Sequence, residues 1–309
     1  MNLEKFKYYA AALTSVAIWG FFAIPLRNLK EYPSDVILHY RIFTSLLITW
    51  ILILIFRRSE VKSDIAFLRL SAPEDRRKIF ILTLIAGVLI TGNWFTFIYA
   101  VNNVSLTSAA FAYMVCPLIT AIGGFLILKE HLTRIKLTAI AIAFVSILIL
   151  AQGSLVEVLW SIFIASLYAF YLIIQRVITK LDKLNVLGVQ LIISFLIMLP
   201  LFLYRHDPIP TEISFWLNIL LISVVFTIIP LFLSLYALIG MPSSTLGIII
   251  YLNPVIAFAV AFLYFNDPIH PYQVYAYTLL LVAVVVFNWS LIAGMFKHGY
   301  ERVNTTDIQ

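Results

Sequence analysis

The stretch PSDVILHYRIFTSLLITWILILIF, residues 33–56, decides the fold of this chain. It is an apolar run with a few polar groups, and Arg41 is the charged residue that lies deepest inside it. A helix of about twenty apolar residues is long enough to cross the hydrocarbon core of a bilayer. The stretch therefore predicts a transmembrane helix.

Similar runs fill almost all of the 309 residues. Ten transmembrane helices are predicted, at residues 8–28, 33–56, 79–101, 105–128, 134–152, 155–178, 184–204, 214–238, 243–265 and 270–295. The composition agrees, because 62% of the residues are hydrophobic and only 12% are charged, whereas soluble domains average about 25% charged. We expect an all-α integral membrane protein without a soluble domain.

The ten runs fall into two halves of five, which we assign to residues 1–152 and 153–295, with a cytoplasmic tail at 296–309. An odd number of spans per half means that the second half crosses the membrane in the opposite sense. When the sequence is shifted by 137 residues, Pro117 falls on Pro254 and Phe125 falls on Phe262. This pattern predicts two inverted five-helix repeats, an architecture of secondary transporters.

Basic residues indicate the orientation. With the N-terminus in the cytoplasm, the inner segments carry seventeen Lys and Arg residues and the outer segments carry three. Such an excess marks the cytoplasmic side, so both termini are expected in the cytoplasm. The charged start, residues 1–7, could begin a signal peptide. However, the apolar stretch after it exceeds twenty residues and has no clear cleavage site, which favours an uncleaved first span.

Arg41 is the most informative single residue. A mid-membrane arginine costs about 2.5–3.5 kcal/mol or more, so a partner, a cavity or an anionic substrate group must compensate. The alternative is structural, with Arg41 reaching the surface or pairing with backbone carbonyls. His39, in the same helix and one turn after Asp35, is a candidate for coupling transport to protons, or alternatively an interfacial hydrogen-bonding group.

Further candidates for substrate binding are amide and aromatic residues. Asn93 needs partners inside the membrane and therefore faces other helices or a cavity. Tyr168, Tyr171 and Gln175 share one helix face through spacings of three and four residues, and either line a pathway or pack against a neighbouring helix. Trp19 and Asn253 complete the predicted site.

Three prolines interrupt predicted spans, at Pro117, Pro230 and Pro254. A proline inside a helix frees the carbonyl one turn earlier, and a neighbour or a water must satisfy it. Such kinks can form a binding recess, although simple bending is the alternative.

Some residues and motifs are missing from the chain, and their absence excludes several kinds of chemistry. The fifteen Asp and Glu residues lie in loops or close to span ends, and no phosphate-binding G-x-x-x-x-G-K motif occurs. The single cysteine, Cys116, can form neither an intrachain disulfide nor a metal cluster. We expect no metal, no cofactor and no nucleic-acid partner. The expected partners are a small-molecule substrate and the lipid bilayer, and the oligomeric state is left open.

The segment GNWFTFIYAVNN, residues 92–103, resembles the RarD subgroup of EamA-type transporters in the drug/metabolite transporter superfamily. AIWGFFAIPL at 17–26, the Arg41 helix and YLNP at 251–254 are similar too, so the resemblance covers essentially the whole chain. It implies a ten-helix inner-membrane carrier with a central cavity between its halves. Members mostly export or exchange amino acids and other small metabolites.

Two positions depart from the subgroup's pattern. The subgroup usually has His-Arg in the second span, whereas here Tyr40 precedes Arg41 and the histidine is at position 39. The family favours Asn-Pro in the fourth span, whereas this chain has Cys116-Pro117 there and keeps Asn-Pro only at Asn253-Pro254. A site role for the ninth span is therefore better supported than one for the fourth.

We expect a secondary transporter, an exporter or exchanger of small organic metabolites such as amino acids or related carboxylates, and not an enzyme. A chloramphenicol or general drug exporter is the alternative within the transport class. A membrane enzyme would need acidic metal-binding residues near a span end, and a non-transporting sensor or scaffold would need a signalling domain or a long tail.

Overall fold

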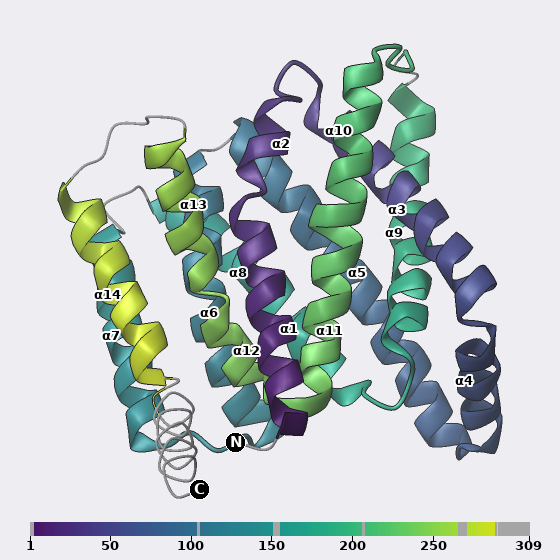
Figure 1. Cartoon of the computed structure of the whole chain (residues 1–309), viewed down its shortest axis with the longest axis horizontal. Helices are drawn as coiled ribbons and strands as arrows, with labels where there is room; N and C mark the ends of the chain where they lie inside the picture. Colours follow the sequence, from purple (N-terminus) through teal and green to yellow (C-terminus); the bar gives the residue numbers. More distant parts are fainter. Residues whose placement is uncertain are drawn as a thin grey trace, which may run out of the picture.

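The computed structural model is an assembly of helices that run side by side (Figure 1). It describes residues 3–103, 106–150, 155–205, 208–264, 271–287 and 289, and these residues contain no strand. The helices are α1 (Leu3–Gly20), α2 (Ala23–Arg27), α3 (Ser34–Phe56), α4 (Arg58–Leu70), α5 (Pro73–Asn103), α6 (Leu106–Leu128), α7 (Arg134–Leu150), α8 (Leu155–Val177), α9 (Lys183–Arg205), α10 (Ile213–Ser223), the π-helix η1 (Val224–Ile228), α11 (Ile229–Gly240), α12 (Ser243–Ile249), α13 (Leu252–Leu263) and α14 (Pro271–Phe287). The all-α prediction is confirmed for this part of the chain.

Six helical segments among the described residues are long and apolar enough to cross a bilayer. They are Phe6–Arg27, Ser34–Phe56, Pro73–Ala100, Leu159–Val177, Lys183–Arg205 and Ile213–Gly240. Three shorter apolar segments are Ala112–Leu128, Ser243–Ile256 and Val274–Phe287. The chain is therefore a multi-pass membrane protein, and the count of ten spans stays a prediction.

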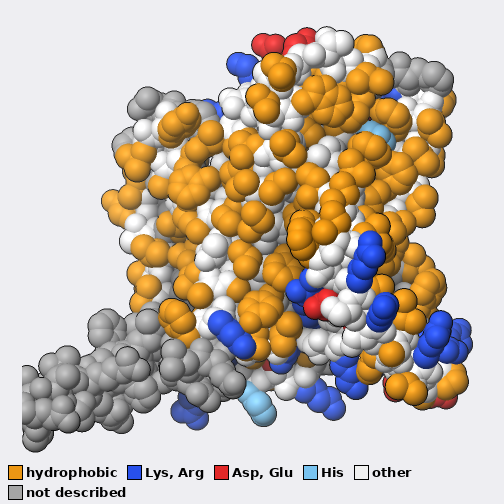
Figure 2. All heavy atoms as spheres, turned by 45° about the vertical axis from the view of Figure 1, so that its right-hand side comes forward, with side chains coloured by type: hydrophobic (Ala, Val, Ile, Leu, Met, Phe, Trp, Pro, Cys, Tyr) orange, Lys and Arg blue, Asp and Glu red, His pale blue; other side chains and the backbone are white. Residues whose placement is uncertain are grey.

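The side chains on the surface also separate a lipid-facing region from a water-facing region. Figure 2 shows hydrophobic side chains over the middle of one face and Lys and Arg side chains at its lower end. Phe56, Leu126 and Leu203 are large apolar side chains that are more than half exposed. Since lipid tails solvate such groups and exclude ions, the apolar middle of the face marks the lipid-facing surface.

The two predicted halves interleave rather than form two separate bundles. Helix α8 packs against α5 and α6, α9 against α3 and α5, α11 against α1, and α14 against α7. Hydroxyl groups strengthen these contacts, since Ser15 Oγ donates to the Pro230 carbonyl at 2.7 Å and Ser146 Oγ to that of Ala276 at 2.7 Å. Polar bonds of this kind hold helices together in lipid.

Three of the apolar segments are interrupted one turn before a proline. Helices α1 and α2 are separated at Phe21–Phe22, before Pro25, and α12 and α13 are separated at Ile250–Tyr251, before Pro254. The third interruption is η1, which precedes Pro230. Because proline has no N–H, the carbonyl four residues earlier loses its α-helical donor, and the backbone must find another one.

Each freed carbonyl has a partner in the structure. The N–H of Ile24 donates to Phe21 O at 3.1 Å, and the N–H of Asn253 donates to Ile250 O at 2.9 Å. The carbonyl of Phe226, four residues before Pro230, accepts the indole N–H of Trp19 at 3.0 Å. The expectation that a neighbour satisfies the freed carbonyl is confirmed at Pro230, whereas at Pro254 the partner is an N–H of the same turn.

Candidate functional site

A central cavity lies where the three interrupted segments meet. It is lined by Trp19, Phe22, Leu26, Ile37, Arg41, Asn93, Trp94, Phe97, Ile98, Tyr113, Tyr168, Leu231, Ile250 and Asn253. These side chains come from both halves of the chain. They enclose a cavity of about 40 Å³, which is narrow between its walls.

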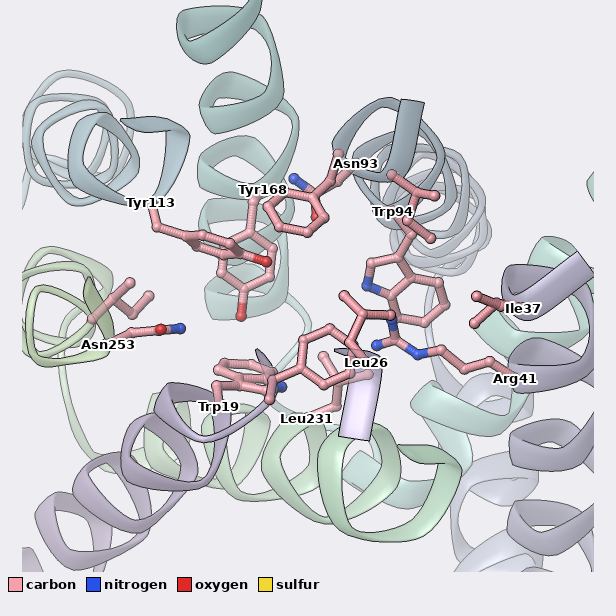
Figure 3. Close-up of a pocket in the computed structure, with 14 residues that line it drawn as sticks. Trp19, Leu26, Ile37, Arg41, Asn93, Trp94, Tyr113, Tyr168, Leu231 and Asn253 are labelled. Carbon is pink, nitrogen blue, oxygen red and sulfur yellow. The ribbon is translucent and has the colours of Figure 1, made fainter. Parts of the chain in front are cut away.

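Five of the seven residues that the sequence predicted for substrate binding line this cavity: Trp19, Arg41, Asn93, Tyr168 and Asn253. Figure 3 shows that the polar ends of Arg41, Tyr113, Tyr168 and Asn253 point into the same space. Sequence reasoning missed Trp94 and Tyr113 as site residues. Their signals were present, since Trp94 follows Asn93 and Tyr113 lies one turn before Pro117.

Arg41 is buried in α3 and reaches the cavity between aromatic rings. Its Cζ lies 5.2 Å from the centroid of the Phe22 ring and 4.8 Å from that of Trp94, an arrangement in which the ring faces attract the cation. Its Nε–H donates to Thr227 Oγ1 at 2.7 Å. Among the described residues no carboxylate forms an ion pair with Arg41.

Trp19 and Asn93 are held in place by backbone carbonyls. The Trp19 indole bonds to Phe226 O, and its ring stands edge-on to that of Tyr168, with the centroids 6.0 Å apart. The side-chain N–H of Asn93 donates to Ile164 O of α8 at 2.9 Å. These bonds fix one polar atom of each side chain and leave the Asn93 carbonyl oxygen for another partner.

Of Tyr168, Tyr171 and Gln175, the polar residues on one face of α8, only Tyr168 lines the cavity. The hydroxyl of Tyr168 is buried and has no hydrogen-bond partner among the described residues. Tyr171 and Gln175 are also buried but do not line the cavity. The Tyr171 hydroxyl donates to Gln190 Oε1 at 3.3 Å, because this part of that helix face is turned toward α9.

His39 lies outside the central cavity. Its ring stacks on that of Phe202 at a centroid distance of 3.8 Å, and its Nδ1 has no partner among the described residues. Asp35 does not pair with His39, because its carboxylate forms an ion pair with Arg205. The proposed proton-holding pair of Asp35 and His39 is therefore not formed in this structure.

A second cavity adjoins the first on the side away from the N-terminus. It has a volume of about 480 Å³ and is lined by Pro33, Ser34, Asp35, Leu38, Phe95, Ile98, Tyr99, Leu201 and Arg205. Ile98 lines both cavities.

The central cavity has a few polar groups set in apolar walls. Its lining combines one guanidinium, two amide side chains and two tyrosine hydroxyls with aromatic and aliphatic walls, and it contains no acidic residue. No group of three or more His, Cys, Asp or Glu residues able to hold a metal occurs in the described part of the chain. Binding sites for small molecules typically have such apolar walls with a few polar groups that fix orientation.

Several known proteins are similar to this chain. The model of the EamA-like transporter family matches residues 6–152 and 155–289. The chain is 28% identical over 291 residues to an uncharacterised transporter of Pseudomonas aeruginosa (91% of this chain and 93% of the relative). It is 28% identical over 286 residues to the uncharacterised transporter YojE of Bacillus subtilis (90% and 92%). It is 27% identical over 287 residues to the protein RarD of Escherichia coli (89% and 92%).

A crystal structure with 12% sequence identity superposes with a TM-score of 0.72 and covers 94% of this chain and 98% of its own. At that identity the likeness concerns the fold alone. The resemblance to the RarD subgroup that residues 92–103 carry is confirmed by the sequence matches.

Proposed function

The chain belongs to the EamA-like transporter family, and on this premise we propose that it is a secondary transporter of small organic metabolites that carry an anionic group. Amino acids and related carboxylates are the proposed substrates, and export or exchange across the bacterial plasma membrane is the proposed direction. Two of the relatives are themselves named as transporters.

One observation carries the proposal: the guanidinium of Arg41 faces a central cavity, and no described carboxylate pairs with it. An unpaired charge inside a membrane protein costs several kcal/mol unless a partner arrives. A substrate carboxylate would supply that partner through two parallel hydrogen bonds to the guanidinium.

Alternating access between two inverted repeats is the proposed mechanism. The family model matches the chain in two segments of similar length, which supports a duplicated architecture with ten spans. Interrupted helices at the site support it as well, because transporters typically bind their substrates at discontinuous helices near the middle of the membrane. The second cavity and Ile98 form the proposed route to the outer side, with both chain termini in the cytoplasm.

The energy source is proposed to be the gradient of the substrate itself or of an exchanged solute. No acidic residue lines the central cavity, and His39 lies outside it. A carboxylate that alternates between proton and substrate, as in many proton-coupled carriers, is therefore not available among the lining residues.

Transport in proteoliposomes tests the proposal. Metabolites whose extracellular level differs between a deletion strain and an overexpressing strain identify the substrate, and its uptake is then measured for the wild type, Arg41→Ala and Arg41→Lys. We expect Arg41→Ala to abolish uptake of an anionic substrate. Arg41→Lys should retain part of it, because lysine keeps the charge but loses the planar fork.

Three results would count against the proposal. Undiminished uptake of an anionic substrate by both variants would remove Arg41 from the site. Uptake of neutral chloramphenicol alone, independent of Arg41, would favour a drug exporter. No metabolite difference between the two strains would favour a non-transporting sensor or scaffold.

A further inference from the structure

We infer that Thr227, on the π-helical turn η1, is the positioning residue for Arg41. Its hydroxyl holds Nε of the guanidinium so that the two terminal nitrogens are directed into the central cavity. The inference rests on the proposed function, since it concerns how Arg41 is presented to an anionic group. No feature of the sequence around Thr227 marked it as part of the site.

The Thr227 hydroxyl makes two hydrogen bonds that fix its direction. It donates its only proton to Ile222 O at 2.9 Å and accepts the Nε–H of Arg41 at 2.7 Å. Because a hydroxyl has one donor and two acceptor lone pairs, the bond to Ile222 leaves a lone pair for Arg41. Both residues are buried, so water does not compete for either bond.

The π-helical turn explains why this threonine can do so. Threonine hydroxyls in α-helices bond to the carbonyl three or four residues earlier, and in this chain Thr91 bonds to Gly87 O in that way. Thr227 instead bonds five residues back, within a turn in which the N–H of Ile229 also bonds five residues back, to Val224 O. Such π-turns occur frequently at functional sites.

The same turn also positions Trp19, which lines another side of the cavity. Its Phe226 carbonyl accepts the indole N–H of Trp19, and the Phe226 ring lies 5.7 Å from the ring of Phe22, which in turn faces Arg41. The side-chain and main-chain atoms of η1 thus orient Arg41 and Trp19 together. Thr227 itself does not line the cavity, which separates positioning from direct contact with a solute.

Ser223 provides a matched control on the same helix. It lies one turn before Thr227, is equally buried, and its Oγ donates to the backbone carbonyl of Arg41 at 3.2 Å. Ser223→Ala therefore removes a buried hydrogen bond to Arg41 without touching the guanidinium. Thr227→Val removes the bond to the guanidinium at nearly constant side-chain volume, and Thr227→Ser keeps it.

The experiment measures whether the protein binds a carboxylate more tightly than the matching uncharged amide. Detergent-solubilised full-length protein is titrated with benzoate and benzamide, phenylacetate and phenylacetamide, and butyrate and butyramide. Quenching of tryptophan fluorescence is recorded, and the part of it lost in Trp94→Phe reports binding in the cavity. For each pair the ratio of the two dissociation constants isolates the contribution of the negative charge. Melting temperatures are recorded for every variant.

We expect the wild type to prefer each acid, and Arg41→Gln to lose that preference. Thr227→Val should reduce the ratio about tenfold or more, as expected when a charged group loses a hydrogen bond, while Thr227→Ser and Ser223→Ala keep the wild-type ratio. Thr227→Ala carries the same expectation as Thr227→Val if the latter does not fold.

An unchanged ratio in folded Thr227→Val, with the ratio lost in Arg41→Gln, would overturn the positioning role and leave the proposed function standing. A ratio lost equally in Ser223→Ala would also overturn it, because general loosening of the helix would then explain the effect. A wild type with no preference for any acid would overturn the proposal of an anionic substrate and this inference together.

Discussion

At the scale of single residues, the polar groups of the central cavity differ in whether the protein itself satisfies them. The indole of Trp19, the amide N–H of Asn93 and Nε of Arg41 each have an internal partner. The Tyr168 hydroxyl has none among the described residues. Since an unsatisfied buried hydroxyl costs about 1–3 kcal/mol, its retention points to a ligand or water partner.

Replacement of Tyr168 by Phe tests this point. We expect an unchanged or slightly higher melting temperature, because the substitution removes an unsatisfied polar atom and keeps the ring. Apparent affinity for the transported substrate should fall about tenfold if the hydroxyl donates to a carboxylate. Thermal unfolding and substrate uptake are measured on the same preparation.

Tyr171→Phe is the matched control, three residues along the same helix. Its hydroxyl bonds to Gln190 outside the cavity, so we expect a stability loss of about 0.5–1.5 kcal/mol and normal substrate affinity. The opposite pattern, with affinity lost in Tyr171→Phe and kept in Tyr168→Phe, would contradict the assignment of the cavity.

At the scale of elements, the crossing of α6 and α12 is a close approach of two helices. The Glu130 carboxylate after α6 accepts the N–H groups of Ser243 and Ser244 at 2.8 and 2.9 Å, which caps α12 as a carboxylate at a helix N-terminus does. Within the crossing, a Cβ added to Gly247 would lie 2.8 Å from Thr120 Cβ.

Gly247→Ala should therefore destabilise the protein by about 1–3 kcal/mol, the usual cost of overpacking. The neighbouring atoms also include the backbone oxygen of Pro117 at 3.3 Å, which cannot rotate away. We expect a lower melting temperature and reduced transport, because the two helices must separate to admit the added methyl group.

Gly92→Ala serves as the comparison, because Gly92 also lies in a transmembrane helix but its added Cβ would meet only Leu167 side-chain atoms at 3.6 Å or more. We expect this variant to be as stable as the wild type. Equal stability of Gly247→Ala and Gly92→Ala would show that the α6–α12 crossing is looser than the structure indicates.

At the scale of the whole molecule, orientation follows from charge. The loop helix α4 and the start of α5 carry Arg58, Lys62, Arg76, Arg77 and Lys78 at the end where α1 begins, and Figure 2 shows the basic side chains gathered there. On the positive-inside rule we propose that this end lies in the cytoplasm and that the second cavity, with Asp35 and Arg205, lies at the opposite surface.

Single cysteines test this orientation in a Cys116→Ala background. Cysteine at Ile209, an exposed residue between α9 and α10, should react with a membrane-impermeant maleimide in intact cells. Cysteine at Lys62 in α4 should react only after permeabilisation. Reversed labelling of the two positions would place the termini outside and contradict the proposed topology.

By itself, the sequence determined the helical class, the membrane location, the family and five residues of the cavity lining. These features depend on local composition: apolar runs of bilayer length, and polar residues that lipid would penalise, such as Arg41 and Asn93. Each is visible without knowing which helix packs against which, because the cost of a polar group in hydrocarbon depends mainly on its depth.

Only the tertiary structure decided which polar residues share a cavity and what holds them there. Tyr168 and Tyr171 have the same helical periodicity, yet one faces the cavity and the other faces α9. Thr227 lies 186 positions from Arg41 in the chain, and its contact depends on a π-turn. The reason is physical: periodicity specifies a helix face, but the neighbour of that face is chosen by packing between the interleaved halves.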